Sequence, residues 1–187
     1  PSNLPFNSGM TKPMALAAPV LFGTIFSEAA RARRKSPLRC GASKVFSVDV
    51  EGKGEIPNFE LKDLNGKKTE SKKIFQNGKK TLFIIAAEWC PHCKQEMPEV
   101  QKFYDANKDK VNVVVVYSNA QSNLGKVQRY VKDNGYTFPI YYDEEGYITS
   151  GFGLDAFPFN LKINNNKIEE KLELPIDLES LTAAFAK

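Results

Sequence analysis

The stretch "AAEWCPHCKQEMPEV", Ala86–Val100, places Cys90 and Cys93 close together, with two residues between them. Those two residues are a proline and the only histidine of the chain, and the only tryptophan directly precedes the motif. Two thiols at this spacing can hold a metal ion, close a small disulfide loop or exchange electrons with another protein. The sequence on either side of the pair decides between these uses.

The cysteine pair lies where a predicted strand meets a predicted helix. Before it, Thr81–Ala87 is a continuous apolar run, typical of a strand covered on both faces. After it, residues of one helical face recur at intervals of four, three and four: Cys93, Met97, Val100 and Tyr104. We therefore expect Cys90 at the N-cap of a helix, and Cys93 one turn inside it on the side that faces the core.

This placement favours disulfide exchange, which needs a thiolate to attack and a second thiol to resolve the mixed disulfide. A free cysteine has a pKa of about 8.5, and a helix N-terminus or a C-x-x-C motif lowers it to roughly 3.5–7.5. Unpaired N–H groups and the positive end of the helix dipole favour a negative sulfur at Cys90. We assign the attack to Cys90 and the resolution to Cys93, which we expect to be the less exposed thiol. Pro91 suits the first helical turn, where no N–H is needed.

His92 can stabilise a Cys90 thiolate without contacting the disulfide form. It would then favour the reduced pair and make the oxidised pair a stronger oxidant. The alternative, that His92 is a polar turn residue without this effect, stays open.

Other uses of the two cysteines fit the sequence less well. A structural zinc site takes four ligands, and only His92 and Cys40, in a segment of different composition, are left to complete one. A haem attachment site needs a histidine after the second cysteine, where this chain has Lys94. A disulfide around two residues hardly constrains the unfolded chain. We expect no metal, and no cofactor apart from the redox-active disulfide itself.

The rest of the chain alternates predicted strands and helices. A short hairpin with an Asn-Gly turn (59–70) precedes the first core strand. A second buried strand (111–117), an amphipathic helix (124–135), an extended segment (138–142), a terminal hairpin (158–174) and a helix capped by Asp177 follow. This order predicts an α/β protein with a central mixed β-sheet flanked by helices and an N-terminal β-hairpin extension, as in a thioredoxin fold.

Composition changes near residue 45. Residues 1–45 hold seven basic residues and one acid, whereas residues 46–187 hold 19 basic and 21 acidic residues. The net charge of +4 thus comes from the first segment and gives no support for nucleic-acid binding by the second. We expect a basic leader or tail at 1–45, whether disordered, targeting or added for expression, and one thioredoxin-like domain at 46–187.

The leader contains an apolar run, "PMALAAPVLFGTIF" at 13–26, with the length of a secretory signal core. The basic cluster "RARRK" that follows would resist export, and an arginine-rich leader with few acids is also typical of organellar transit peptides. We expect an extracytoplasmic protein, periplasmic or secreted, whose association with a membrane would depend on this leader. Cytoplasmic and organellar locations stay open.

Several short stretches resemble one family. They are Ile56–Phe59, Asn65–Lys67, "EWCPHCKQEMP" at 88–98, "FPIYYDEEG" at 138–146 and "GLDAFPF" at 153–159. Together they resemble the thioredoxin superfamily, and more narrowly the TlpA-like (AhpC/TSA-related) extracytoplasmic thiol-disulfide oxidoreductases, over residues 56–187. The resemblance implies protein thiols and disulfides as substrates and a redox partner protein, and we expect a monomer.

The resemblance also implies roles for residues outside the cysteine pair. Pro158 matches a cis-proline that faces the disulfide, with the Phe157 backbone available to an extended substrate; an ordinary turn proline is the alternative. Trp89 is expected to pack beside the motif and shield it, with simple filling of the core as the alternative. We therefore count Trp89, Pro91, Phe157 and Pro158 as substrate-binding residues.

Two features depart from the family pattern. Many thioredoxins have a buried aspartate in the strand before the motif, where this chain has Ile84, so the usual proton acceptor is absent. Glu96, one turn after Cys93, matches an acid of TlpA-like proteins and is the candidate to replace it, unless it is a solvated helix glutamate. The C-P-H-C motif resembles DsbA-type oxidases, whereas most TlpA-like proteins are reductants.

These observations predict a thiol-disulfide oxidoreductase that donates or isomerises disulfides. Its predicted catalytic residues are Cys90, Cys93, His92 and Glu96. Two alternatives stay open: a binding or accessory module that keeps the fold without catalysis, and a cytosolic thioredoxin-like reductant.

Overall fold

The computed structural model describes residues 45–186, so the predicted leader lies outside the described residues, apart from its last position. The elements in chain order are β1 (Glu60–Lys62), β2 (Lys68–Glu70), α1 (Ser71–Phe75), β3 (Lys80–Ala86), α2 (Pro91–Asn107), β4 (Val111–Ser118), α3 (Leu124–Asn134), β5 (Ile140–Asp143), α4 (Tyr147–Gly151), β6 (Phe159–Asn164), β7 (Lys167–Lys171) and α5 (Leu178–Phe185).

The main sheet has five strands in the order β5-β4-β3-β6-β7. The central strand β3 pairs in parallel with β4 and antiparallel with β6, so the predicted mixed sheet is confirmed. All of β3 after Lys80 is buried, as its unbroken apolar run predicts. Because β3 is held on both edges and both faces, the position where it ends, directly before the cysteine pair, is fixed by the whole sheet.

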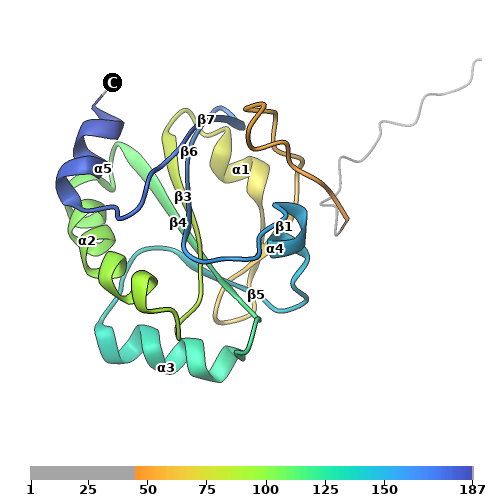
Figure 1. Cartoon of the computed structure of the whole chain (residues 1–187), viewed down its shortest axis with the longest axis vertical. Coiled ribbons are helices and arrows are strands. Elements are labelled where there is room, and N and C mark those ends of the chain that lie inside the picture. The colour runs from red at the N-terminus through yellow and green to blue at the C-terminus, as the bar shows by residue number, and fades with distance from the viewer. Residues whose placement is uncertain (1–44, 187) are drawn as a thin grey trace, which may run out of the picture. The chain divides into compact units, whose positions relative to one another are not determined.

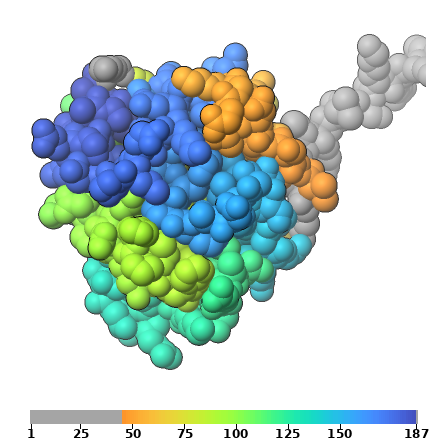
Figure 2. All heavy atoms as spheres, viewed as in Figure 1, coloured from red at the N-terminus to blue at the C-terminus, as the bar shows by residue number. Residues whose placement is uncertain are grey.

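Helices cover both faces of this sheet (Figure 1). On one face, α2 packs beside α5, and side chains of α2, α3 and α5 share a core with Leu82 and Ile84 of β3. On the other face, α1 and α4 cover a second core that contains Phe83 and Ile85. On the surface drawn in Figure 2, α2 (yellow-green) lies between α5 (dark blue) and α3 (turquoise). The cysteine-bearing helix is therefore the middle helix of its layer.

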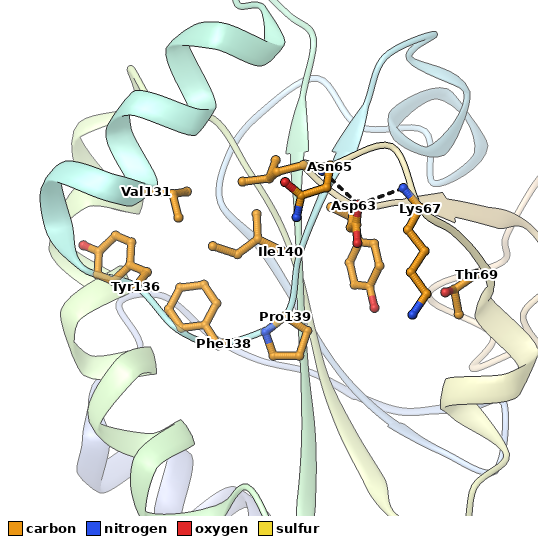
Figure 3. Close-up of a pocket in the computed structure, with 11 residues that line it drawn as sticks. Asp63, Asn65, Lys67, Thr69, Val131, Tyr136, Phe138, Pro139 and Ile140 are labelled. Carbon is orange, nitrogen blue, oxygen red and sulfur yellow. Dashed lines mark hydrogen bonds between the residues drawn. The ribbon is translucent and has the colours of Figure 1, made fainter.

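The predicted N-terminal hairpin is confirmed as β1 and β2. Its turn is tied by the Asp63 carboxylate, which accepts hydrogen bonds at 2.9 Å from the backbone N–H groups of Asn65 and Lys67 (Figure 3). Gly66 follows with φ +86°, a conformation that favours glycine. The hairpin, α3 and β5 border a pocket of about 310 Å³, and the pocket shares no residue with the predicted site.

Two helices were not predicted, α1 and α4. Each has only five residues, too few to show a helical period in the sequence. The predicted last helix is confirmed, with Asp177 and Ser180 forming a reciprocal capping box at its start. No helix within residues 45–186 is long and apolar enough to cross a membrane.

The core on the α1 side depends on Phe59, which is fully buried and stacks on Phe46 with ring centroids 5.1 Å apart. We expect Phe59→Ala to lower the free energy of unfolding by about 3–5 kcal/mol, because it leaves a cavity among aromatic rings. Urea denaturation followed by circular dichroism measures this change. The control Val45→Ala alters a side chain that is 91% exposed and should cost no more than about 0.5 kcal/mol. Equal costs for the two variants would contradict the assignment of Phe59 to the core.

Candidate active site

Cys90 is the N-cap of α2, as the sequence predicted, and Pro91 is the first residue of the helix. The Cys90 sulfur lies 3.4 Å from the backbone nitrogen of Cys93, whose N–H it accepts. It lies 3.3 Å from the carbonyl oxygen of Phe157, to which the thiol donates. The first turn of α2 holds no acidic residue, so no carboxylate of this turn neutralises the positive end of the helix dipole.

The two sulfurs differ in environment more than in exposure. Cys90 is 4% exposed and Cys93 is 1% exposed, so the expected difference in exposure is small. Burial raises the pKa of the Cys93 thiol well above its usual value, outweighing a hydrogen bond with the Ala87 backbone that lowers it. The neighbouring Cys90 and Glu96 raise the pKa of Cys93 further. Cys93 is therefore a protonated thiol near neutral pH, and it needs a nearby base to ionise.

The Phe157–Pro158 peptide bond is cis, which excludes the alternative of an ordinary trans turn proline. Pro158 is buried at the start of β6, and Phe157 is half-buried beside Cys90. The loop between α4 and β6 therefore brings the Phe157 carbonyl to the Cys90 sulfur. That carbonyl already accepts the Cys90 thiol, so one of its lone pairs is occupied in this state.

Trp89 covers the site from the side of the β4–α3 loop. Its ring packs edge-on against Phe157, with centroids 6.2 Å apart, and its indole N–H donates to the carbonyl oxygen of Ala120 at 2.7 Å. The side chain is 41% exposed, so the alternative that Trp89 simply fills the core is wrong. Pro91 and His92 are also exposed on the first turn of α2.

Glu96 is buried, with 1% exposure, so the alternative of a solvated helix glutamate is wrong. Its Oε2 accepts a hydrogen bond from Nδ2 of Asn160 at 3.2 Å, and its Oε1 accepts one from the backbone N–H of Ile176, also at 3.2 Å. Burial raises the pKa of Glu96, while these two hydrogen bonds and the charge of His92 act to lower it. The carboxyl group borders a pocket of about 460 Å³, together with His92, Gln95, Leu174 and Pro175.

Sequence reasoning missed Asn160, the side chain that holds Glu96. Asn160 lies on β6 directly opposite Ile84 of β3, in the antiparallel register. Ile84 is the position where the expected aspartate is absent, so the polar group next to it comes from the neighbouring strand. The available signal was a polar residue two positions after Pro158, inside an otherwise apolar strand start.

The structure thus brings all eight predicted site residues to one place around the N-terminus of α2. They are Trp89, Cys90, Pro91, His92, Cys93, Glu96, Phe157 and Pro158. Among residues 45–186, no group of three or more His, Cys, Asp or Glu side chains is arranged to hold a metal ion.

A sequence model of the Redoxin family matches residues 51–180. The chain belongs to the Redoxin family. Sporulation thiol-disulfide oxidoreductase A of Bacillus subtilis is 33% identical over 126 residues, which cover 66% of this chain and 74% of that protein. Thiol-disulfide oxidoreductase ResA of Halalkalibacterium halodurans is 31% identical over 109 residues, 58% of this chain and 60% of that protein.

The crystal structure of StoA from Bacillus subtilis superimposes with a TM-score of 0.62 at 30% identity, covering 72% of this chain and 100% of that chain. The predicted thioredoxin fold is confirmed by this likeness. The relatives also confirm the predicted class of enzyme, a thiol-disulfide oxidoreductase. They leave the direction of electron flow open.

The raised pKa of Glu96 predicts how stability changes with pH. Its ordinary value is 4.5, and the folded state holds the proton more tightly than the unfolded state does. The wild type therefore loses stability as the pH rises from this value through the higher folded pKa. Glu96→Gln carries no such proton. Relative to wild type, the free energy of unfolding of this variant should be lowest in acid and should rise across that pH window. Urea denaturation at a series of pH values measures the difference.

Glu99, one turn further along α2 and outside the buried site, gives a control of opposite sign. Its hydrogen bond with Lys102 lowers the pKa of Glu99, so this carboxylate stabilises the fold above its ordinary pKa and loses that contribution in acid. Glu99→Gln should therefore lose stability relative to wild type as the pH rises. The same trend in both variants would show that the stability change does not come from the burial of Glu96.

Proposed function

We propose that the protein exchanges disulfides with protein substrates through Cys90 and Cys93. The observation that carries the proposal is the place of Cys90 at the N-cap of α2, with its sulfur 3.4 Å from the backbone nitrogen of Cys93. A negative sulfur there faces unpaired N–H groups and the positive end of a 17-residue helix. The two named relatives, both thiol-disulfide oxidoreductases, support the same chemistry.

In the oxidising direction, a substrate thiolate attacks the Cys90 sulfur of the oxidised pair. The Cys90–Cys93 bond breaks, Cys93 leaves with the bonding electron pair, and a mixed disulfide joins the substrate to Cys90. A second substrate thiolate then attacks the substrate sulfur of that mixed disulfide, and Cys90 leaves as a thiolate. The substrate has lost two electrons and the pair has gained them. In the reverse direction Cys90 attacks a substrate disulfide and Cys93 resolves the mixed disulfide.

Glu96 moves the proton of Cys93 in this scheme. A thiolate at Cys93 is unfavourable, because burial raises the pKa of that thiol. Glu96 lies one turn away on the same helix, is itself buried, and borders the pocket beside the first turn of α2. It gives a proton to Cys93 as that sulfur leaves, and takes the proton back before Cys93 attacks.

Substrate binds across the exposed first turn of α2 and the Phe157–Pro158 loop. Trp89, Pro91 and Phe157 offer apolar surface on the approach to the Cys90 sulfur, and Pro158 shapes the loop that faces it. We propose that an extended polypeptide segment with a cysteine lies there. A redox partner protein that restores the pair would use the same surface.

We propose that the protein donates or isomerises disulfides. The support is His92, an exposed residue of the first turn whose imidazolium can stabilise the thiolate and hence the reduced form of the pair. Location outside the cytoplasm remains part of the proposal, and it rests on the apolar run at 13–26.

The division of roles between the sulfurs predicts the behaviour of Cys93→Ser. With no resolving thiol, the mixed disulfide through Cys90 should accumulate when Cys90 of the variant attacks the disulfide of an oxidised protein substrate and one substrate sulfur leaves as a thiolate, because nothing inside the protein releases it. Non-reducing gel electrophoresis and mass spectrometry of the intact adduct detect it. Cys90→Ser is the matched control and should form no adduct. An adduct of equal yield through Cys93 would reverse the assignment.

The role of His92 predicts a less oxidising pair in His92→Ala. Loss of the thiolate-stabilising side chain should make the reduction potential more negative by about 30 mV, equivalent to about 1.4 kcal/mol. Equilibration with glutathione buffers, followed by Trp89 fluorescence or thiol alkylation, gives the potential. Lys94→Ala removes a cation two residues further along the exposed surface and serves as the control. A potential unchanged in His92→Ala, or changed equally in both, would remove His92 from the tuning of the pair.

A further inference from the structure

Asn160 has no role in the steps of disulfide exchange proposed for Cys90, Cys93 and Glu96. It is 1% exposed and lies on β6, where it faces the α2 layer beside Ile84. Its Nδ2 donates to Oε2 of Glu96 at 3.2 Å. Its Oδ1 is buried and has no hydrogen-bond partner in the described part of the chain. Buried polar atoms are nearly always hydrogen-bonded, so an unpartnered oxygen next to a buried carboxyl group calls for an explanation.

The second donor to Glu96 limits where a proton can bind. The backbone N–H of Ile176 points at Oε1, and a backbone amide is a donor in every protonation state. A proton on Glu96 is therefore best placed on Oε2, the oxygen that faces Asn160. With Nδ2 in its present position, an O–H on Oε2 would meet an N–H donor. The same amide turned over would present Oδ1, which accepts the O–H.

We propose that Asn160 is a positioning residue whose side-chain amide turns over as Glu96 gains or loses its proton, donating through Nδ2 to the carboxylate and accepting through Oδ1 from the carboxylic acid. This inference rests on the proposed role of Glu96 in disulfide exchange. A neutral amide suits the task because it carries a donor and an acceptor on one planar group of fixed size. An aspartate at this position would instead place a second carboxyl group beside the first.

The two orientations of the Asn160 amide are nearly equivalent in energy apart from the proton on Glu96. In the present orientation Oδ1 lacks a partner, and after a turn Nδ2 would take its place. One buried polar atom of Asn160 is unsatisfied in either orientation, so the state of Glu96 decides between them. A fixed donor would favour only the carboxylate and would oppose its protonation.

On α2 itself, Glu96 interacts with two titratable groups, His92 and Cys93. His92 lowers the pKa of Glu96 from the solvent side, and Glu96 raises the pKa of Cys93 from the core side. From β6 and from the segment before α5, the groups that reach Glu96 are the neutral Asn160 side chain and the Ile176 backbone. The nearest cation further along β6, Lys162, is paired with Glu169. Proton transfer therefore runs between Cys93 and Glu96, with Asn160 following it.

The experiment separates the two thiol steps in the full chain. Because Cys40 would also react, every protein compared carries Cys40→Ser, and the reduced protein is mixed with a stoichiometric amount of 5,5′-dithiobis(2-nitrobenzoate) in a stopped-flow instrument over about pH 5 to 9. Cys90 attacks first and releases one thionitrobenzoate, and Cys93 then attacks the Cys90 sulfur and releases the second. In parallel, carbon-13 NMR of the Glu96 carboxyl group follows its titration.

Asn160→Leu keeps the size of the side chain and removes both donor and acceptor. We expect the second phase to slow about tenfold, the equivalent of about one hydrogen bond, with the first phase unchanged. We expect the Glu96 midpoint to move by less than about half a pH unit, because both of its protonation states lose a partner. Asn160→Thr keeps a hydroxyl that both donates and accepts, and its second phase should be faster than that of Asn160→Leu. The control Lys162→Met changes a buried polar residue of the same strand and should leave the second phase as in wild type.

Three outcomes would overturn the inference: an unchanged second phase in Asn160→Leu, a midpoint raised by about one unit or more, as expected of a fixed donor, or no recovery in Asn160→Thr. Failure of the proposed function looks different, because the wild type itself would then lack the second phase. If Asn160→Leu does not fold, nuclear Overhauser contacts of the Asn160 Nδ2 protons in the wild type decide. As the pH falls through the Glu96 midpoint, the Nδ2 protons should lose their contacts with Glu96 and gain contacts with other neighbours. Unchanged contacts would contradict the turning over of the amide.

Discussion

The amino end of α2 is the constraint on which the site depends. Its free N–H groups need an acceptor, and the residue at the N-cap is a cysteine whose sulfur accepts the N–H of Cys93. The sulfur is placed there by β3, which pairs on both edges and is buried on both faces, so its end is held rigidly. The Phe157–Pro158 loop leads into β6, the direct neighbour of β3. One strand pair therefore positions both the Cys90 sulfur and the loop that faces it.

Because the sulfur of Cys93 is buried, the polar groups that serve it are buried too and need partners of their own. Cys93 is 1% exposed, and burial raises the pKa of its thiol, so exchange needs a proton carrier in the core. In the proposed exchange Glu96 is that carrier, but it is itself buried, and a buried carboxylate needs hydrogen-bond donors. Asn160 from β6 and the Ile176 backbone from the segment before α5 provide them. The Glu96 carboxyl group is thus satisfied by two donors, whereas Oδ1 of Asn160 is left without a hydrogen-bond partner in the described part of the chain.

The parts of the structure that a local pattern defines could be predicted from the sequence. The apolar run of β3, the helical spacing after Cys93 and the capping residue Asp177 each gave an element in the right place. The surroundings of Glu96 could not be predicted, because they depend on which helix covers which face. In β6, polar and apolar residues alternate from Phe159 to Asn164, which indicates a strand with one solvated face. At Asn160 and Lys162 that face is instead buried, so Asn160 becomes a partner of a residue 64 positions earlier.

The charges around the first two turns of α2 act in opposite senses on the two sulfurs. Cys90 lies at the positive end of the helix dipole, whereas at Cys93 the desolvation and the nearby Glu96 disfavour a negative charge. Two thiolates one turn apart would also repel each other, and this adds to the asymmetry. In the structure the Cys90 thiol donates to the carbonyl oxygen of Phe157, and burial makes Cys93 hold its proton. Forming the disulfide must also remove the proton of Cys93, and in the proposed exchange Glu96 is the group that takes it.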